Sequence, residues 1–370
     1  MNSIKDASPC FWQPQIGTEE HRLVSAVLES NFLNDGQVTA EFERQLSVLL
    51  GVRHVVSVTS GTAAIYLALA ALDIGPGDEV IVPDVTFIAT ANAVSMTGAK
   101  PVLVDVEPRT LNIDAEAAAR AITSRTKAII PVHVSGRAAD MFALLGIGEA
   151  NGLSIVEDAA EAFTSKAAGR CLGTIGKAGC FSFSPNKTIT TGQGGAVVTD
   201  DDAVCARLRE LKDQGRPVRG TGGDDIHRSI GYNFKFTNLQ AAVGLGQLSY
   251  LNARVERMTA IHRTYAQALD GAAGVGLLPF SIDSGEVPQW TDALVENRAG
   301  LCEYLAQRGI LCRNFWHPLH TQAPYRQSDE GFPNSTALAQ RALWLPSAFT
   351  LSDDDVVTVC RHIRVFYEGD

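Results

Sequence analysis

The stretch Ser57-Val-Thr-Ser-Gly-Thr-Ala-Ala64 joins a short apolar strand to the start of a helix through a turn of small residues. The helix begins near Thr62, continues through a run of Ala and Leu residues, and is stopped by Gly75-Pro-Gly77. Short apolar, β-rich runs then alternate with helical stretches along the chain. This alternation predicts an α/β fold, with a mostly parallel sheet whose strands are joined by crossover helices.

The alternation places the expected elements. We expect strands at Val55–Val58, Val80–Pro83, Pro101–Val104, Ala128–Val132, Ser154–Glu157, Gly179–Phe183 and Ala196–Thr199. We expect helices at Ala89–Met96, Ala115–Ile122, Ala138–Glu149, Asp202–Asp213 and Arg298–Arg308, a broken helix over Asn238–Leu269, and a mobile loop at Gly220–Gly223. The periodicity lapses around Gly271–Gly285. We therefore predict a large domain over residues 1–270, with an N-terminal arm, and a smaller C-terminal α+β domain over residues 271–370.

Composition and charge exclude several classes of protein. The chain has 370 residues, 45% hydrophobic and 19% charged, so it can bury a large core and disorder is not expected. No segment approaches the ~20 apolar residues of a membrane span, and the N-terminus lacks a signal-peptide core, so we expect a cytoplasmic protein. A net charge of −10 disfavours nucleic-acid binding. The seven cysteines are scattered without a C-x-x-C pair, so neither a disulfide framework nor a metal site is predicted.

Two side chains suggest chemistry on a carbonyl compound. Lys187 stands in the run Phe181-Ser-Phe-Ser-Pro-Asn-Lys-Thr-Ile-Thr-Thr-Gly-Gln-Gly-Gly195, between an apolar strand and a glycine turn, where a partly desolvated amine can form an imine. A solvated loop lysine is the alternative. Asp158 ends the run Leu153-Ser-Ile-Val-Glu-Asp158, so it lies at the carboxyl edge of the sheet, where ligands bind. It could hold a protonated ring nitrogen, or it could cap a following helix.

Two further features of the sequence could bind the phosphate group and the flat ring of a ligand. The turn after Val58 exposes backbone N–H groups and the positive end of a helix to an anion, although Ser60 could serve only as the helix cap. Phe87, beyond the strand that closes at Pro83, could stack on a flat ring or pack in the core. Together with the amine and the carboxylate, these features predict a pyridoxal phosphate site.

Several motifs extend across most of the chain. They are Ser60-Gly-Thr-Ala-Ala64, Gly75-Pro-Gly-Asp-Glu-Val-Ile-Val-Pro83, Thr86-Phe-Ile-Ala-Thr-Ala-Asn92, His133 with Gly136 and Asp140-Met141, Glu157-Asp-Ala-Ala-Glu161, Asn186-Lys-Thr-Ile-Thr-Thr-Gly192 and Gly231-Tyr-Asn-Phe-Lys-Phe-Thr-Asn-Leu-Gln-Ala-Ala242. With these motifs the chain resembles the DegT/DnrJ/EryC1/StrS sugar aminotransferases. Within that family, the Asn-Lys-Thr-Ile-Thr-Thr-Gly form, Val287-Pro-Gln-Trp-Thr291 and His317-Pro-Leu-His320 look most like GDP-perosamine synthases.

The resemblance implies an aspartate-aminotransferase-like fold (fold type I) and roles for individual residues. Lys187 would form the internal aldimine and shuttle a proton, and Asp158 would keep the pyridine nitrogen protonated. The other cofactor contacts would come from Ser60, Gly61, Thr62 and Ser182 at the phosphate, Phe87 on the ring and Glu161 beside the phenolic oxygen. Asn233 matches a position that reaches the phosphate from the neighbouring subunit, which implies a homodimer with shared active sites.

The resemblance also implies the two substrates. Glutamate would give its amine, and a nucleotide-linked keto-deoxysugar, a 4-keto-6-deoxyhexose in the GDP-perosamine synthases, would receive it. The diphosphate needs cations, for which the loop residues are Arg219, His227, Arg313, His317 and His320. Solvated surface charges or, for the last two, packed structural histidines are the alternatives.

Some positions depart from the family pattern, and other activities compete. Gln193 replaces a usual Glu, Lys177 a common Asp, and Val134-Ser135 the usual Leu-Tyr, which bears on the sugar rather than on the cofactor. An aminotransferase for 3-keto sugars or keto-cyclitols is one alternative. A related sugar 3-dehydratase carries histidine at the lysine position, so Lys187 argues against it. A non-catalytic regulator would need a DNA-binding segment that Met1–Gln15 is too short to supply.

Overall fold

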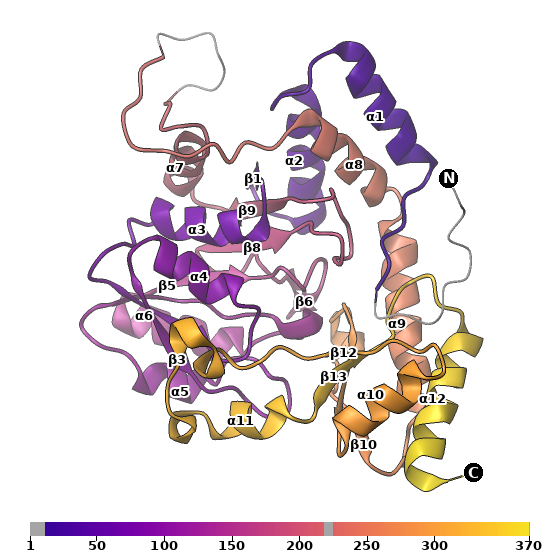
Figure 1. Ribbon diagram of the computed structural model, residues 1–370. Coiled ribbons are helices and arrows are strands. Elements are labelled where there is room, and N and C mark those ends of the chain that lie inside the picture. The colour runs from indigo at the N-terminus through magenta and orange to yellow at the C-terminus, as the bar shows by residue number, and fades with distance from the viewer. Residues whose placement is uncertain (1–11, 218–224, 370) are drawn as a thin grey trace.

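A seven-stranded sheet forms the centre of the molecule (Figure 1). The computed structural model describes residues 12–217 and 225–369. The strands of this sheet lie in the order β1-β9-β8-β5-β4-β2-β3. Their bounds are β1 His54–Val58, β2 Glu79–Pro83, β3 Lys100–Val104, β4 Thr126–Ile129, β5 Ser154–Asp158, β8 Ala178–Ser182 and β9 Gly195–Thr199.

Most of the sheet is parallel, as predicted, but one strand runs the other way. The strands β3, β2, β4, β5 and β8 pair in parallel, whereas β9 is antiparallel to both β8 and β1. Residues 183–194, between β8 and β9, form turns and bends rather than a crossover helix, so the chain folds back beside β8 at once. The Lys187 run is this connection, so both of its ends are anchored in neighbouring strands.

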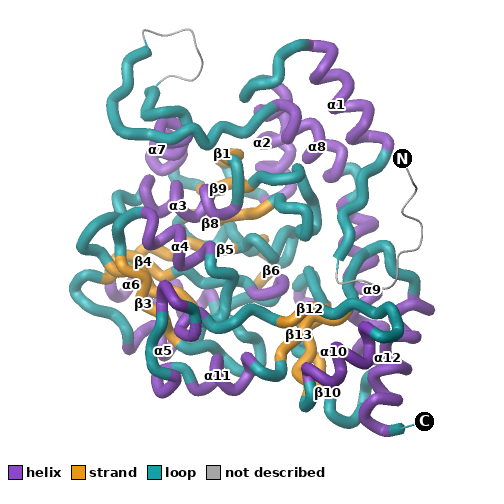
Figure 2. The backbone as a smooth tube through the Cα atoms, in the orientation of Figure 1, coloured by secondary structure: helices purple, strands orange, loops and turns teal. Residues whose placement is uncertain are grey.

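Helices cover both faces of the sheet, as the tube in Figure 2 shows. The strands alternate with period two: Val80 and Val82 pack into the core beneath α3, α4 and α7, and Ile81 into the core on the opposite face, beneath α5 and α6. Helices α2 and α8 pack over β1, β8 and β9 on that opposite face, and α1 packs on α8. Their bounds are α1 Thr18–Ser30, α2 Gln37–Leu50, α3 Gly61–Ala71, α4 Ala89–Met96, α5 Ala115–Arg120, α6 Met141–Asn151, α7 Asp202–Lys212 and α8 Asn238–Leu248.

A second sheet is antiparallel and has the order β10-β11-β13-β12. Helices α9, α10 and α12 cover one of its faces, and Ile261 and Tyr265 of α9 lie in that core. The other face presents Trp290 and Trp344 to loops at the carboxyl edge of the large sheet. The bounds are α9 Leu251–Ala268, β10 Val275–Leu277, β11 Thr291–Val295, α10 Arg298–Ala306, β12 Arg313–Asn314, β13 Ala342–Leu345 and α12 Asp353–Glu368.

The chain returns to the large sheet between β12 and β13. Leu319 and Phe332 pack into the core beneath α3 and α4. At the start of α11 (Pro333–Ala339), the backbone N–H groups of Asn334 and Ser335 donate to the Asp105 carboxylate, each at 2.9 Å. This return segment, residues 319–335, belongs to the predicted C-terminal domain but packs on the large sheet. The domain division between residues 270 and 271 stays a prediction.

The expected elements differ from the observed ones mainly at their ends. The broken helix is observed as α8 and α9. The strand expected at Ala128–Val132 begins and ends earlier, as β4, although Ile130 N–H still donates to the Ile81 carbonyl and Val132 still forms a bridge with Asp158. A small hairpin, β6 Lys166–Ala167 with β7 Arg170–Cys171, was not expected, nor were α1 and α2. The predicted loop Gly220–Gly223 lies outside the described residues. Among residues 12–217 and 225–369, no helix is both long enough and apolar enough to span a membrane.

Candidate active site

A cavity of about 300 Å³ lies at the carboxyl ends of β5 and β8, beside the N-terminus of α3. The large sheet supplies one wall, and the second sheet with its neighbouring loop supplies Trp290, Arg313, Trp316 and Trp344. The predicted cofactor residues that line it are Ser60, Gly61, Thr62, Phe87, Asp158, Glu161, Ser182 and Lys187. The structure thus brings these distant segments to one place.

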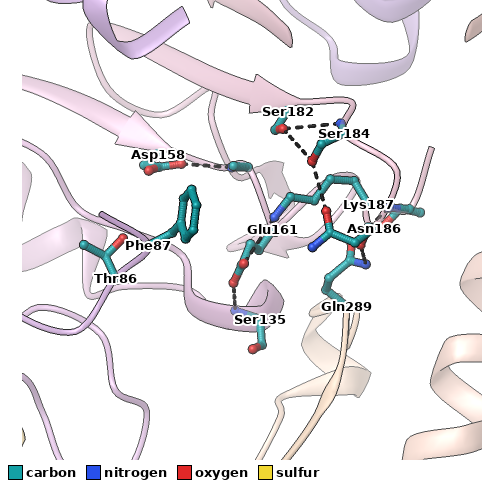
Figure 3. Close-up of polar contacts among 12 residues, drawn as sticks. Thr86, Phe87, Ser135, Asp158, Glu161, Ser182, Ser184, Asn186, Lys187 and Gln289 are labelled. Carbon is teal, nitrogen blue, oxygen red and sulfur yellow. Dashed lines mark hydrogen bonds and ion pairs between the residues drawn. The ribbon is translucent and has the colours of Figure 1, made fainter. Parts of the chain in front are cut away.

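Lys187 reaches into this cavity from the β8–β9 connection. Its Nζ donates to Oε1 of Glu161 at 3.2 Å and lies 5.0 Å from the centre of the Trp290 ring. Figure 3 shows the side chain extending toward Glu161. The side chain is only 12% exposed. The solvated loop lysine is therefore not what the structure shows, and a partly desolvated amine is what imine chemistry requires.

Glu161 accepts the hydrogen bond of the Lys187 amine and is itself held by the backbone. Its Oε2 accepts a hydrogen bond from the backbone N–H of Ser135 at 3.0 Å (Figure 3). Burial raises the pKa of Glu161, and the nearby charge of Lys187 opposes that rise. A carboxyl with a raised pKa in hydrogen-bonding distance of an amine can exchange a proton with it.

Asp158 is the last residue of β5 and is buried at the cavity wall. Its carboxylate accepts from the Thr90 hydroxyl at 2.8 Å and from the backbone N–H of Ala160 at 3.1 Å. Burial raises the pKa of Asp158, and the Thr90 hydrogen bond opposes the rise. No helix follows it, because residues 159–165 form turns, so the helix-cap alternative is wrong. A buried carboxylate of this kind favours a cationic partner such as a protonated ring nitrogen.

The start of α3 lies against the end of β8, and both line the cavity. Ser60 is extended and its side chain accepts from the backbone N–H of Ala63 at 3.1 Å, so it caps the helix. The first N–H groups of a helix have no partner within it and favour an anion. A Cβ at Gly61 would lie 2.8 Å from Cβ of Ser182, so only glycine permits this approach of helix and strand. Ser182 shares a 3.2 Å contact with the Ser184 hydroxyl, which donates to Asn186.

Phe87 lies between β2 and α4 and lines the same cavity. Its ring is 54% exposed, so the core-packing alternative is wrong. Figure 3 shows the ring beside Asp158. An aromatic face left open next to a carboxylate can cover a flat, cationic ring.

The structure does not bring all of the predicted substrate contacts to one place. Arg313 lines the cavity, and His317 lines an adjoining cleft that shares Thr86 and Phe87 with it. His227 is exposed outside the cavity and contacts the Gln214 carbonyl. Asn233, which was predicted at the cofactor phosphate rather than at the substrate, is also exposed outside this cavity. Arg219 lies outside the described residues.

His320 does not lie on a sugar-contacting surface, and that prediction is wrong. Its side chain is fully buried, its Nδ1 lies 2.6 Å from the Asp84 carboxylate, and its ring stacks on Phe332 at 4.5 Å. The packed structural histidine is the alternative that the structure supports.

The sequence reasoning missed part of the site. Trp290, Trp316 and Trp344 line the cavity, and Gln289 contacts the backbone on both sides of Lys187. Trp316 adjoins His317 in an aromatic run that could have indicated a ligand. Nothing local distinguishes Trp344, because its place in the cavity depends on how the second sheet packs on the first.

The residues present fit pyridoxal phosphate. A buried carboxylate faces the cavity for the ring nitrogen, an open aromatic face is available for the ring, and an amine lies across from them. The glycine-only approach of α3 to Ser182 leaves room for a phosphate at the helix end. The donor set is therefore that of a type I aminotransferase site.

Known proteins resemble this chain over nearly its whole length. The model of the DegT/DnrJ/EryC1/StrS aminotransferase family matches residues 14–364. The GDP-perosamine synthase of Escherichia coli O157:H7 is 35% identical over 96% of this chain and 98% of its own length. The spore coat polysaccharide biosynthesis protein SpsC of Bacillus subtilis (strain 168) is 37% identical over 96% of both chains.

Solved structures agree with these relatives. The structure of DesV from S. venezuelae in complex with a ketimine intermediate is 35% identical, with a TM-score of 0.90 over 95% of this chain and 94% of that one. A DegT DnrJ EryC1 StrS aminotransferase from Brucella abortus is 34% identical, with a TM-score of 0.89 over 95% of both chains. With the lysine, carboxylate and helix end that pyridoxal phosphate requires, this chain belongs to the DegT/DnrJ/EryC1/StrS family of pyridoxal-phosphate-dependent sugar aminotransferases.

Proposed function

We propose that this enzyme transfers an amino group from glutamate to a nucleotide-linked 4-keto-6-deoxysugar, the reaction type of the GDP-perosamine synthases that it resembles. The observation that carries the proposal is the arrangement of Lys187 Nζ with Glu161, across the cavity from Asp158 and Phe87. Three GDP-perosamine synthases are 32–35% identical to it and support the sugar class.

The protein's own groups divide the work. When bound, pyridoxal phosphate supplies an electron sink that allows an amino group to leave one carbon and join another. Asp158 holds the proton on the ring nitrogen, and the first turn of α3 with Ser182 binds the phosphate. Phe87 covers one face of the ring. Each of these groups fixes the cofactor without taking part in proton transfer.

Lys187 moves the proton. Its amine lies 3.2 Å from the Glu161 carboxylate, so a neutral amine can take a proton from a substrate carbon and return it to another position. Glu161 keeps the amine on the cavity side between the two transfers. A wall of indole rings from Trp290 and Trp344 limits water around it.

Arg313 is the cation proposed for the substrate. It lines both the main cavity and the adjoining cleft, and its guanidinium lies 5.4 Å from the centre of a Trp344 ring. An arginine there can pair with the carboxylate of the amino donor or with a phosphate of the nucleotide. His317 lines the adjoining cleft and is proposed to contact the sugar or its nucleotide.

Absorbance of the bound cofactor tests the two half-reactions separately. Adding glutamate to the purified enzyme should shift the visible band, and adding the right keto sugar should restore it. Sugars linked to GDP, dTDP and UDP, each with a 4-keto or a 3-keto group, are then compared by mass spectrometry of the aminated product. A spectrum unchanged by glutamate contradicts the donor, and amination of 3-keto sugars alone contradicts the sugar class.

A further inference from the structure

The segment that enters the second sheet contacts the immediate neighbours of Lys187 at two points. The first contact is with the backbone. The Gln289 side chain accepts from the backbone N–H of Thr188 at 3.1 Å and from its hydroxyl at 2.6 Å, and donates to the Asn186 carbonyl at 3.3 Å. These bonds bracket Lys187 on both sides. Gln289 is 1% exposed, so no water competes for them.

The second contact runs through Ser135. Its hydroxyl donates to Oδ1 of Asp292 at 2.9 Å, and its backbone N–H donates to Glu161, the partner of Lys187. Asp292 is fully buried and is also held by Arg137. Ser135 has φ 53°, a left-handed conformation that a side chain rarely adopts, so the tertiary contacts hold it there.

We propose that Gln289 and Asp292 form a two-point clamp on Lys187, in which Gln289 fixes the lysine backbone and Asp292, through Ser135, fixes the carboxylate that holds the amine. The second sheet is then a positioning element of the catalytic site as well as its wall. Ser135 connects the two residues, because its hydroxyl contacts Asp292 and its backbone N–H contacts Glu161. The inference rests on the role proposed for Lys187, but it does not depend on the sugar.

The rate of cofactor binding tests the clamp and requires no substrate. Pyridoxal phosphate is added to the apo-protein, and the rise of the visible band gives the rate at which Lys187 captures it. The variant Gln289→Ala should slow capture by about tenfold or more, because it removes the three hydrogen bonds on either side of Lys187. Thr188→Val removes only the hydroxyl bond at 2.6 Å and should slow capture by a smaller factor.

The contribution of Asp292 is tested by a pH titration of the same absorbance band in the enzyme with pyridoxal phosphate bound. The ionisable groups that line the cavity with Lys187 are Asp158, Glu161 and Arg313, and Asp292 and Arg137 lie behind Ser135. Asp292→Asn removes a negative charge and leaves Arg137 unbalanced, so the midpoint should move to lower pH by about half a unit or more. Ser135→Ala keeps the Asp292 and Arg137 pair and should slow capture.

Ser347→Ala is the matched control. The Ser347 hydroxyl accepts from the backbone N–H of Thr291, between the two clamp residues, at 2.9 Å and touches neither Lys187 nor Glu161. Its capture rate and midpoint should match the wild type. If Gln289→Ala or Asp292→Asn does not fold, Thr188→Val and Ser135→Ala decide. Values equal to the control in all variants overturn the clamp, whereas a missing band in the wild type would overturn the role of Lys187.

Discussion

At the scale of single residues, the role proposed for Lys187 depends on its partly desolvated surroundings. It is 12% exposed, faces a carboxylate at 3.2 Å and an indole ring at 5.0 Å, and is the lysine that lines the cavity. Lys187→Ala should lower kcat by at least about 10³-fold, because the proton transfer then has no base, while cofactor still binds at the phosphate. Steady-state kinetics and cofactor retention on gel filtration measure both.

Lys177→Ala is the control for that change. Lys177 pairs with Asp201 at 2.6 Å on the surface and is 45% exposed. Its loss should leave kcat unchanged. Full activity in the Lys187→Ala protein would remove the lysine from the mechanism.

We expect Asp158 to lower the stability of the apo-protein at neutral pH although turnover requires it. A carboxyl with a raised pKa in the folded state stabilises the apo-protein below the ordinary carboxyl pKa and loses that contribution as pH rises through the raised value. The isostere Asp158→Asn should therefore make the apo-protein more stable at pH 7, by about 1 kcal/mol or more, with the gain vanishing near pH 3. Turnover should fall at least about 10²-fold because the ring nitrogen loses its counter-ion.

Urea melts of apo-protein at both pH values test this expectation. Asp105→Asn provides the comparison, since Asp105 is also buried but binds the N-terminus of α11 rather than the cavity. That variant should lose stability at pH 7. A destabilised Asp158→Asn apo-protein would contradict the account of its pKa.

At the scale of elements, the fit of α3 against β8 sets the phosphate site. Gly61→Ala would place Cβ 2.8 Å from Cβ of Ser182 and force the helix end away from the strand. The dissociation constant of pyridoxal phosphate, measured by tryptophan quenching, should rise by about tenfold or more, because overpacking costs 1–3 kcal/mol. Gly75→Ala, whose Cβ would lie no closer than 3.6 Å to another atom, should bind normally. Equal affinities for the two variants would contradict the phosphate site.

The same scale shows what could be read from the sequence. Helix α4 was predicted with its observed bounds, Ala89–Met96, because its periodicity is local. The direction of β9 could not be predicted, since Gly195–Thr199 is apolar and β-branched whichever way it runs. Of the site residues, Gly61 at a strand-to-helix turn and Asp158 at the end of an apolar strand were predicted because the local pattern marks them. Trp344 was missed because it reaches the cavity from a distant sheet, and Gln289 because its contacts with the residues beside Lys187 depend on how that sheet packs.

At the scale of the whole molecule, Asn233 predicts a dimer with shared sites. It is exposed and lies outside the cavity of its own chain, so a role at the phosphate requires a second copy. Lys187→Ala and Asn233→Ala proteins should each be nearly inactive. After mixing and exchange, half of the dimers should be mixed, each with one intact site, so about a quarter of wild-type activity should return.

Activity of the mixture against total protein concentration measures the exchange. A mixture of Lys187→Ala with Asp158→Asn is the control, because both changes lie in the same chain's cavity. Each site of a mixed dimer then carries one of the two substitutions, so this mixture should remain inactive. It would gain an intact site only if Lys187 and Asp158 came from different subunits. Complementation in the control pair and not in the first would contradict the assignment of Asn233.

The return segment has a consequence for how the molecule melts. Between β12 and β13 the chain leaves one sheet, buries Leu319 and Phe332 in the core of the other, and comes back. Neither sheet can lose its order without pulling side chains out of its neighbour. Calorimetry should therefore record a single endotherm, and a fragment of residues 271–370 expressed alone should not hold a fixed tertiary structure.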